Sequence, residues 1–101
     1  MKKELEALLF QRYPKLFEER AQSPQELGMY WGFECGDGWF DLIDTLCRTI
    51  QSDIEGGDTP PVRVVQVKEK FGTLRFHIRG GNERVRGMID MARTCSKFIA
   101  E

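Results

Sequence analysis

Four carboxylates stand close together in the stretch FECGDGWFDLID, and three of them have helical spacing. Asp37, Asp41 and Asp44 follow an i, i+4, i+7 pattern that would place them on one side of a helix, with Glu34 just before them. Carboxylate oxygens bind hard cations, but calcium loops need more oxygen ligands at closer alternating spacing. We therefore expect no metal site. The acidic residues are interpreted as complementing the dipole of a helix start, with Asp44 pairing with Arg48 four positions on.

One histidine and three cysteines are the other side chains that could act as base, nucleophile or ligand. No accompanying motif supplies His77 with catalytic partners, and its place in an alternating strand is typical of a surface residue. Cys35 precedes a helix start, which lowers a thiol pKa, but the carboxylate of Asp37 opposes that effect. Cys47 and Cys95 fall on apolar stripes and are interpreted as core residues, and no CxxC pair indicates zinc or disulfides. The sequence therefore predicts no enzyme activity and no cofactor.

Cations in the second part of the chain are a better candidate for binding. Residues 1–60 hold 6 Lys or Arg against 12 Asp or Glu, whereas residues 61–101 hold 9 against 4. In an alternating strand pattern these cations fall on one face of a sheet, where they could contact a phosphate backbone or an acidic protein. Lysine on an edge strand also serves simply to prevent aggregation. The candidate residues are Lys68, Lys70, Arg75 and Arg79.

Periodic apolar residues predict the helices that position these groups. An amphipathic helix is expected from Lys2 to about Tyr13, where Pro14 interrupts it before a further helical turn or two. The stripe from Trp39 to about Glu55 follows a 3.6-residue period and ends at a Gly-Gly pair.

Capping residues are predicted at three helix starts. Asp37 stands where an N-cap belongs, so its carboxylate is expected to accept hydrogen bonds from the N–H groups of the first turn. Ser23 and Glu26 have capping-box spacing and indicate a short helical turn. Asn82 is expected to cap a last helix. The buried stripe of that helix should comprise Val85, Met88, Ile89, Ala92, Cys95 and Ile99.

Period-two alternation on both sides of the dipeptide FG predicts a β-hairpin in VRVVQVKEKFGTLRFHIR. A short strand in MYWGFE would add Met29, Trp31 and Phe33, with Gly32 marking a bulge or a close backbone approach. One hairpin alone is marginal, so we expect an α+β fold in which a two- to three-stranded antiparallel sheet, with its hairpin at about residues 62–79, packs against three main helices. The inward set should be Val65, Val67, Leu74, Phe76 and Ile78, and the outward set Lys68, Lys70, Arg75, His77 and Arg79.

Length and composition indicate one soluble domain. A chain of 101 residues usually forms a single core, so residues 1–101 are predicted to be one compact α+β domain. With 41% hydrophobic and 31% charged residues, the chain is typical of globular rather than disordered proteins. The apolar runs are far shorter than the roughly 20 residues that span a bilayer, and the start MKKELEALLF lacks a secretory cleavage region. We expect a cytoplasmic protein with no membrane association.

Helix faces that point away from the core offer another surface. Met91 and Phe98 lie off the main apolar stripe of the last helix, and with Gly87 and Thr94 they form a second patch. A small domain has little polypeptide left to cover such side chains. The patch is a candidate contact for a partner or for a homodimer, although such residues more often contact another part of the same fold.

Two motifs, GDGWFDLID and QVKEKFGTLRF, followed by GMIDMARTCS, give the chain a resemblance to a known family. Over about residues 30–96 it resembles a family of small uncharacterised proteins from bacteria and their phages or prophages. Members of that family often carry a closely spaced cysteine pair after the last helix, whereas Cys95 is the only cysteine in this region, so no zinc role is carried over. The resemblance implies a phage association but no established activity. Small phage proteins often bind and block host machinery, and anti-CRISPR proteins are a leading class among them.

The leading hypothesis is a small non-enzymatic interaction protein that binds and blocks a host protein or nucleoprotein complex, such as a CRISPR effector. An acidic stripe of Asp41, Asp44 and Glu55 could imitate nucleic-acid phosphates toward a basic channel, while the hairpin cations could contact acidic protein or guide RNA. The alternative is a nucleic-acid-binding module that acts directly through the hairpin cations.

Overall fold

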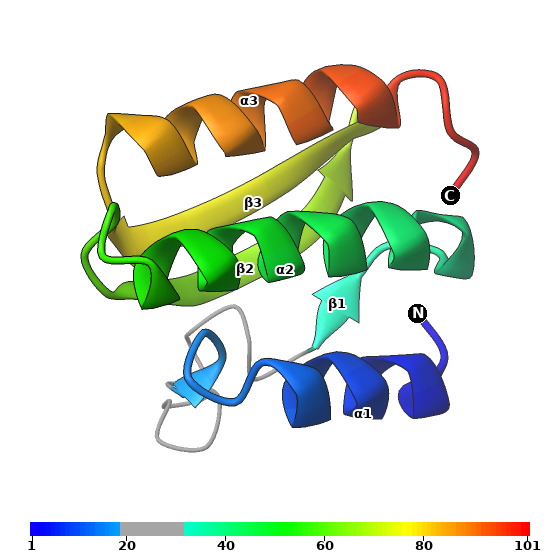
Figure 1. The fold of residues 1–101 in the computed structure, drawn as a ribbon. Coiled ribbons are helices and arrows are strands. Elements are labelled where there is room, and N and C mark those ends of the chain that lie inside the picture. Colours follow the sequence, from blue (N-terminus) through cyan, green and yellow to red (C-terminus); the bar gives the residue numbers. More distant parts are fainter. Residues whose placement is uncertain (19–31) are drawn as a thin grey trace.

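Helices packed on a three-stranded sheet make up residues 1–18 and 32–101, the part of the chain that the computed structural model describes (Figure 1). The combination of three α-helices and one sheet confirms the predicted α+β class. The elements follow the order α1 (Lys3–Arg12), β1 (Phe33–Glu34), the 3₁₀ helix η3 (Asp37–Trp39), α2 (Phe40–Glu55), β2 (Val62–Lys70), β3 (Thr73–Gly80) and α3 (Glu83–Ser96). In Figure 1, α2 and α3 run side by side across the sheet, and α1 lies beyond α2 next to β1.

The sheet is mixed, with the strand order β1-β2-β3. β2 and β3 form the predicted antiparallel hairpin, but β1 runs parallel to β2 and pairs Phe33 with Val67. The expectation of a purely antiparallel sheet is therefore wrong. The reason is the intervening helix, because α2 carries the chain back along the sheet before β2 begins, as a parallel connection requires. The predicted residues Met29 and Trp31, and the capping box at 23–26, lie outside the described residues.

A β-bulge interrupts the alternation of β2. The register pairs Val64 with Ile78 and then Gln66 with His77, so Val65 is an extra residue on its strand. The extra residue shifts the alternation by one position, because side chains of a strand point to opposite faces in turn.

The bulge explains which valines are buried. Val62 and Val64 face the core before it and Val67 faces the core after it, while Val65 is only half-buried. The prediction that Val65 faces inward is wrong, since a period-two pattern read from sequence carries no sign of an inserted residue. Of the other predicted inward residues, Val67, Leu74 and Phe76 are buried, and Ile78 is half-buried against the core.

The start of α2 is built differently from the prediction. Asp37 is not an N-cap, because its Oδ1 accepts a hydrogen bond from the main-chain N–H of Lys2 at 2.7 Å. The N–H groups of Gly36 and Gly38 donate instead to Glu101, at 3.0 Å to its Oε1 and 2.7 Å to its main-chain oxygen. Of the predicted apolar stripe, Leu42 and Ile54 are half-buried, and the buried residues are Trp39, Ile43, Leu46, Cys47 and Ile50.

Asn82 caps α3 as predicted, with its Oδ1 accepting a hydrogen bond from the first turn at 3.3 Å. The other end of the stripe differs, because α3 ends at Ser96 and both Cys95 and Ile99 are exposed. Ser96 takes the inward position, where its Oγ accepts a hydrogen bond from the N–H of Leu74 at 2.9 Å. This bond ties the end of α3 to the start of β3. Of the remaining predicted stripe, Val85 and Ala92 are buried, and Met88 and Ile89 are half-buried.

A buried carboxylate holds α1 to β1. Glu6 is buried, and its Oε2 accepts a hydrogen bond from the N–H of Phe33 at 2.8 Å. Gly32 has a φ of 78°, and a side chain there would collide with this carboxylate, so of the two alternatives predicted for Gly32 the close approach is the one found. The rings of Phe10 and Phe17 pack on Phe33, each with a centroid separation of 5.4 Å.

We expect Glu6→Ala to lower the free energy of unfolding by about 1–3 kcal/mol, because the N–H of Phe33 would remain buried without an acceptor. Urea unfolding followed by circular dichroism measures this change. Glu4→Ala, at an exposed position of the same helix, is the control and should change stability by less than about 0.5 kcal/mol. Equal losses in the two variants would contradict the role assigned to Glu6.

Candidate binding surface

The outward side chains of the hairpin form one basic face. Lys68 lies directly opposite Arg75 in the antiparallel register, and Arg79 lies opposite Arg63. His77 stands between the two arginines of β3 at the same alternation. The register thus places the predicted outward set together. We call Lys68, Lys70, Arg75, His77 and Arg79 the basic face.

Two neighbouring cations of this face lack a counter-charge. Within residues 1–18 and 32–101, no ion pair or side-chain hydrogen bond engages Lys68 or Arg75, and the Nε–H of Arg75 is buried without an acceptor. Glu34 stands beside Lys68 across the parallel pair but forms no ion pair with it. Several other cations that the structure describes do have a carboxylate partner; these pairs include Lys2 with Asp37, Lys3 with Glu6, Arg12 with Asp44, Arg63 with Glu18, Arg84 with Asp53 and Arg86 with Glu83.

The positive charges near His77 affect the pKa of its imidazole. Partial burial lowers its pKa below the ordinary 6.5, and the nearby charges of Lys68 and Arg75 lower it further. The imidazole has cations as neighbours rather than the carboxylate that orients a catalytic histidine. Its environment therefore fits a surface that attracts anions.

Asp44 serves the packing of two helices rather than an outer surface. Its Oδ1 accepts a hydrogen bond from the hydroxyl of Tyr13 at 2.7 Å and forms an ion pair with Arg12 at 3.1 Å. Burial would raise the pKa of Asp44, but the hydrogen bonds from Tyr13 and Arg12 bring it below its ordinary value. The predicted ion pair with Arg48 is wrong, because Arg12 at the end of α1 and Tyr13 just after it reach this carboxylate instead.

The three acidic residues predicted to imitate phosphates lie along α2, but only Asp41 and Glu55 are exposed. Asp41 is exposed in the first turn of α2 and Glu55 is exposed at its last residue, about 21 Å farther along the helix axis. Asp44, which lies between them, is engaged by α1. The structure therefore favours the basic face over the acidic stripe as a binding surface.

The most exposed large apolar side chains in the described ranges are Phe71, Phe98 and Met91. Met91 is 65% exposed and Phe98 is 85% exposed, at the places where the sequence predicted a second patch. Phe71, at the tip of the hairpin, is 87% exposed and was not among the predicted site residues. Its sequence signal is the dipeptide FG, since Asn-Gly or Asp-Gly usually fills such a turn.

The buried thiols are not activated. Burial raises the pKa of Cys35 to about 11, although the nearby amino group of Met1 opposes this shift. Burial also raises the pKa of Cys47 far above its ordinary value. Both side chains are therefore protonated at neutral pH, and neither is a thiolate nucleophile.

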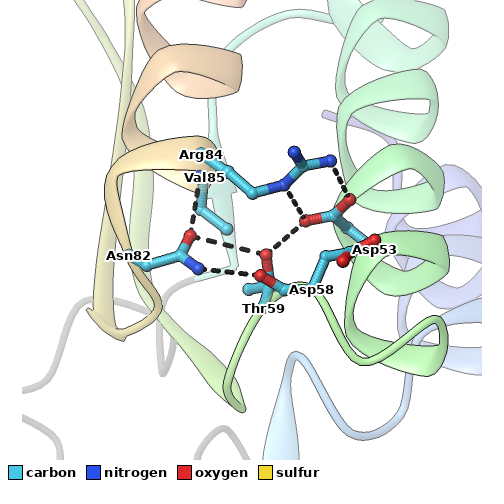
Figure 2. A network of polar contacts seen from close by, with 6 residues as sticks. All are labelled: Asp53, Asp58, Thr59, Asn82, Arg84 and Val85. Carbon is cyan, nitrogen blue, oxygen red and sulfur yellow. Dashed lines mark hydrogen bonds and ion pairs between the residues drawn. The ribbon is translucent and has the colours of Figure 1, made fainter.

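A polar cluster at the opposite end of the hairpin joins α2 to α3 (Figure 2). The guanidinium of Arg84 donates to both carboxylate oxygens of Asp53, at 2.7 and 2.9 Å. The hydroxyl of Thr59 donates to the same carboxylate, and the amide of Asn82 donates to the main-chain oxygen of Asp58 at 3.0 Å. Because Arg84 and Thr59 both donate hydrogen bonds to the carboxylate of Asp53, the cluster is interpreted as a structural link between α2 and α3 rather than a ligand site.

None of the helices in the described ranges has the length and apolar content needed to cross a membrane. Among the same residues, no group of three or more His, Cys, Asp and Glu side chains is arranged to hold a metal ion. Comparison with protein families, curated proteins and solved structures finds no match to this chain.

Asp53 should make stability depend on pH in the acidic range. Hydrogen bonds from Arg84 and Thr59 lower its pKa from 3.8 to about 2, so the folded state favours the ionised carboxylate. Its contribution is complete above pH 4 and is lost as the pH falls through the folded-state pKa of about 2. Asp53→Asn should therefore lower Tm most at neutral pH, and the gap from wild type should narrow below pH 4. Thermal unfolding from neutral to acidic pH measures this gap, and a gap of constant size would contradict the assignment.

Replacing both Lys68 and Arg75 with Gln should raise the pKa of His77 toward 6.5, because two of the three causes of its shift are removed. NMR titration of the imidazole gives the value directly, since the chain has one histidine. Arg86→Gln, on α3 and already paired with Glu83, is the control and should leave the pKa unchanged. An unaltered pKa in the double variant would show that the basic face does not act on His77.

Proposed function

We propose that this chain is a non-enzymatic binding protein that docks through its basic face on an anionic surface of a larger host complex and thereby blocks it. The observation that carries the proposal is the pair of uncompensated cations, Lys68 and Arg75, at directly opposite positions of the hairpin. Two adjacent unpaired positive charges create a local positive potential. This potential attracts an anionic partner and disfavours binding of a cationic one.

The placement of these two cations costs the fold stability. Like charges directly opposite each other in an antiparallel pair destabilise a sheet by up to about 1 kcal/mol. The buried Nε–H of Arg75 adds a further cost, since it has no acceptor among the described residues. Departures from locally favourable design occur where a protein serves a function. An anionic partner would supply the missing charge and acceptor.

The resemblance in sequence is what supports a host complex as the partner. Small proteins of phages and prophages commonly act by occupying a surface of host machinery, and a CRISPR effector is a nucleoprotein complex that offers both acidic and phosphate surfaces. The blocking activity requires no catalytic group. This fits the raised pKa values of Cys35 and Cys47 and the cationic surroundings of His77.

We expect charge reversal of the basic face to abolish capture of the host complex. Tagged wild-type protein and the variant Lys68→Glu/Arg75→Glu are used to capture partners from a bacterial lysate, with and without nuclease, and the affinity for the recovered complex is then measured. Binding should weaken by roughly tenfold or more, and wild-type binding should fall steeply between about 50 and 200 mM salt.

Arg86→Glu/Arg93→Glu is the matched control, because it makes the same change in net charge at exposed positions of α3. This control should bind as wild type does. Equal losses in both variants would show that only net charge matters, and retained binding in the hairpin variant would exclude the basic face. Both outcomes would reject the proposal.

A further inference from the structure

Phe71 has a backbone conformation that aromatic residues rarely adopt. Together with Gly72 it forms the two-residue loop between the paired residues Lys70 and Thr73, with φ values of 54° for Phe71 and 77° for Gly72. Positive φ at both loop positions is the pattern of a type I′ turn, which favours Asn-Gly. A bulky side chain at positive φ strains the backbone.

Burial offers Phe71 no compensation for this strain. Its side chain is 87% exposed, so the ring contributes little to the core. The Nζ of Lys70 lies 5.7 Å from the ring centroid, which is within cation–π distance. A strained residue of this kind points to a function at the tip, because a single change to Asn would relieve the strain.

The basic face leads directly to this ring. Lys70 precedes Phe71, and Lys68 and Arg75 form the next outward positions along the hairpin. Outward residues recur about every 7 Å along a strand, so a flexible polyanion that contacts Lys68 and Arg75 extends naturally to Lys70 and then to the tip.

We propose that the basic face binds single-stranded nucleic acid, with the ring of Phe71 stacking on an unpaired base and Lys68, Lys70 and Arg75 contacting the flanking phosphates. The inference rests on the proposed function and names the anionic ligand that the host complex presents. Proteins that bind single strands without sequence preference combine a positive track with exposed aromatic rings, since every base offers a π-face.

A duplex fits this arrangement less well than a single strand. The bases of a duplex are already stacked on one another, so the ring of Phe71 would have no free face to contact. The cations would still contact duplex phosphates, because that attraction is independent of base pairing. Phe71 should therefore separate the two forms, whereas Lys68 and Arg75 should contribute to both.

Fluorescence anisotropy with labelled DNA and RNA single strands of about 12 nucleotides, and a duplex of the same length, tests the inference. Phe71→Asn should weaken single-strand binding by roughly tenfold or more and leave duplex binding unchanged. The same variant should raise Tm, because Asn-Gly suits the turn, so loss of binding cannot come from unfolding. Phe71→Trp should retain single-strand affinity. Phe98→Asn is the matched control, since Phe98 is 85% exposed and follows a lysine but lies outside the hairpin.

Equal single-strand affinity in wild type and Phe71→Asn would overturn the inference. Absence of binding to any oligonucleotide would also overturn it, and capture of a nuclease-resistant protein that still depended on Lys68 and Arg75 would then leave the proposed function standing with a protein surface as the ligand. Failure of that capture as well would remove both proposals. Single-strand binding lost in Phe71→Asn and kept in Phe98→Asn is the supporting result.

Discussion

The register between β2 and β3 is the constraint on which the rest of the structure depends. A slip of one residue would turn Lys68 toward the helices and Val67 toward solvent, because side chains alternate between the faces of a strand. The bulge at Val65 makes the register unique, because the positions of β2 that face the core are even-numbered before the bulge and odd-numbered after it. In this register the core and the basic face are two consequences of the same pairing. The conformation of Phe71 is a third, because the pairing of Lys70 with Thr73 leaves only two residues to close the loop.

Helices hold the hairpin at both ends. At the tip, the hydroxyl of Ser96 in α3 accepts a hydrogen bond from the N–H of Leu74 in β3 and donates to the carbonyl oxygen of Arg93. At the open end, the N–H of Gly81 donates to the carbonyl oxygen of Pro61 at 3.2 Å, and the adjacent cluster around Asp53 joins the helices that flank this end. A side chain at Gly80 would collide with the same carbonyl, so glycine is required where the two strands separate. The outward face is thus supported from behind along its whole length.

Sequence reasoning succeeds here where the signal is local and repeated. The stripe of α2, the alternation around the FG turn and the cap at Asn82 each depend on residues close together in the chain, and each is found in the structure. It fails where a distant element decides the outcome. The carboxylate of Asp37 is taken by Lys2 and that of Asp44 by Tyr13, and neither approach can be read from spacing within one helix. The parallel placement of β1 and the inserted Val65 are likewise set by tertiary packing.

The two strand pairs of the sheet differ in how far apart in the sequence the paired residues lie. β2 and β3 are joined by a two-residue loop, whereas Phe33 and its partner Val67 are 34 positions apart and β1 contributes only two residue pairs. Closing the longer loop costs more entropy and returns fewer hydrogen bonds, so the hairpin with α3 should form before β1 and α1 are added. Local unfolding should follow the opposite order, because β1 has fewer residue pairs than the hairpin and therefore opens at a lower free-energy cost. The surface that carries Lys68, Arg75 and Phe71 should therefore belong to the part of the fold that assembles first and opens last.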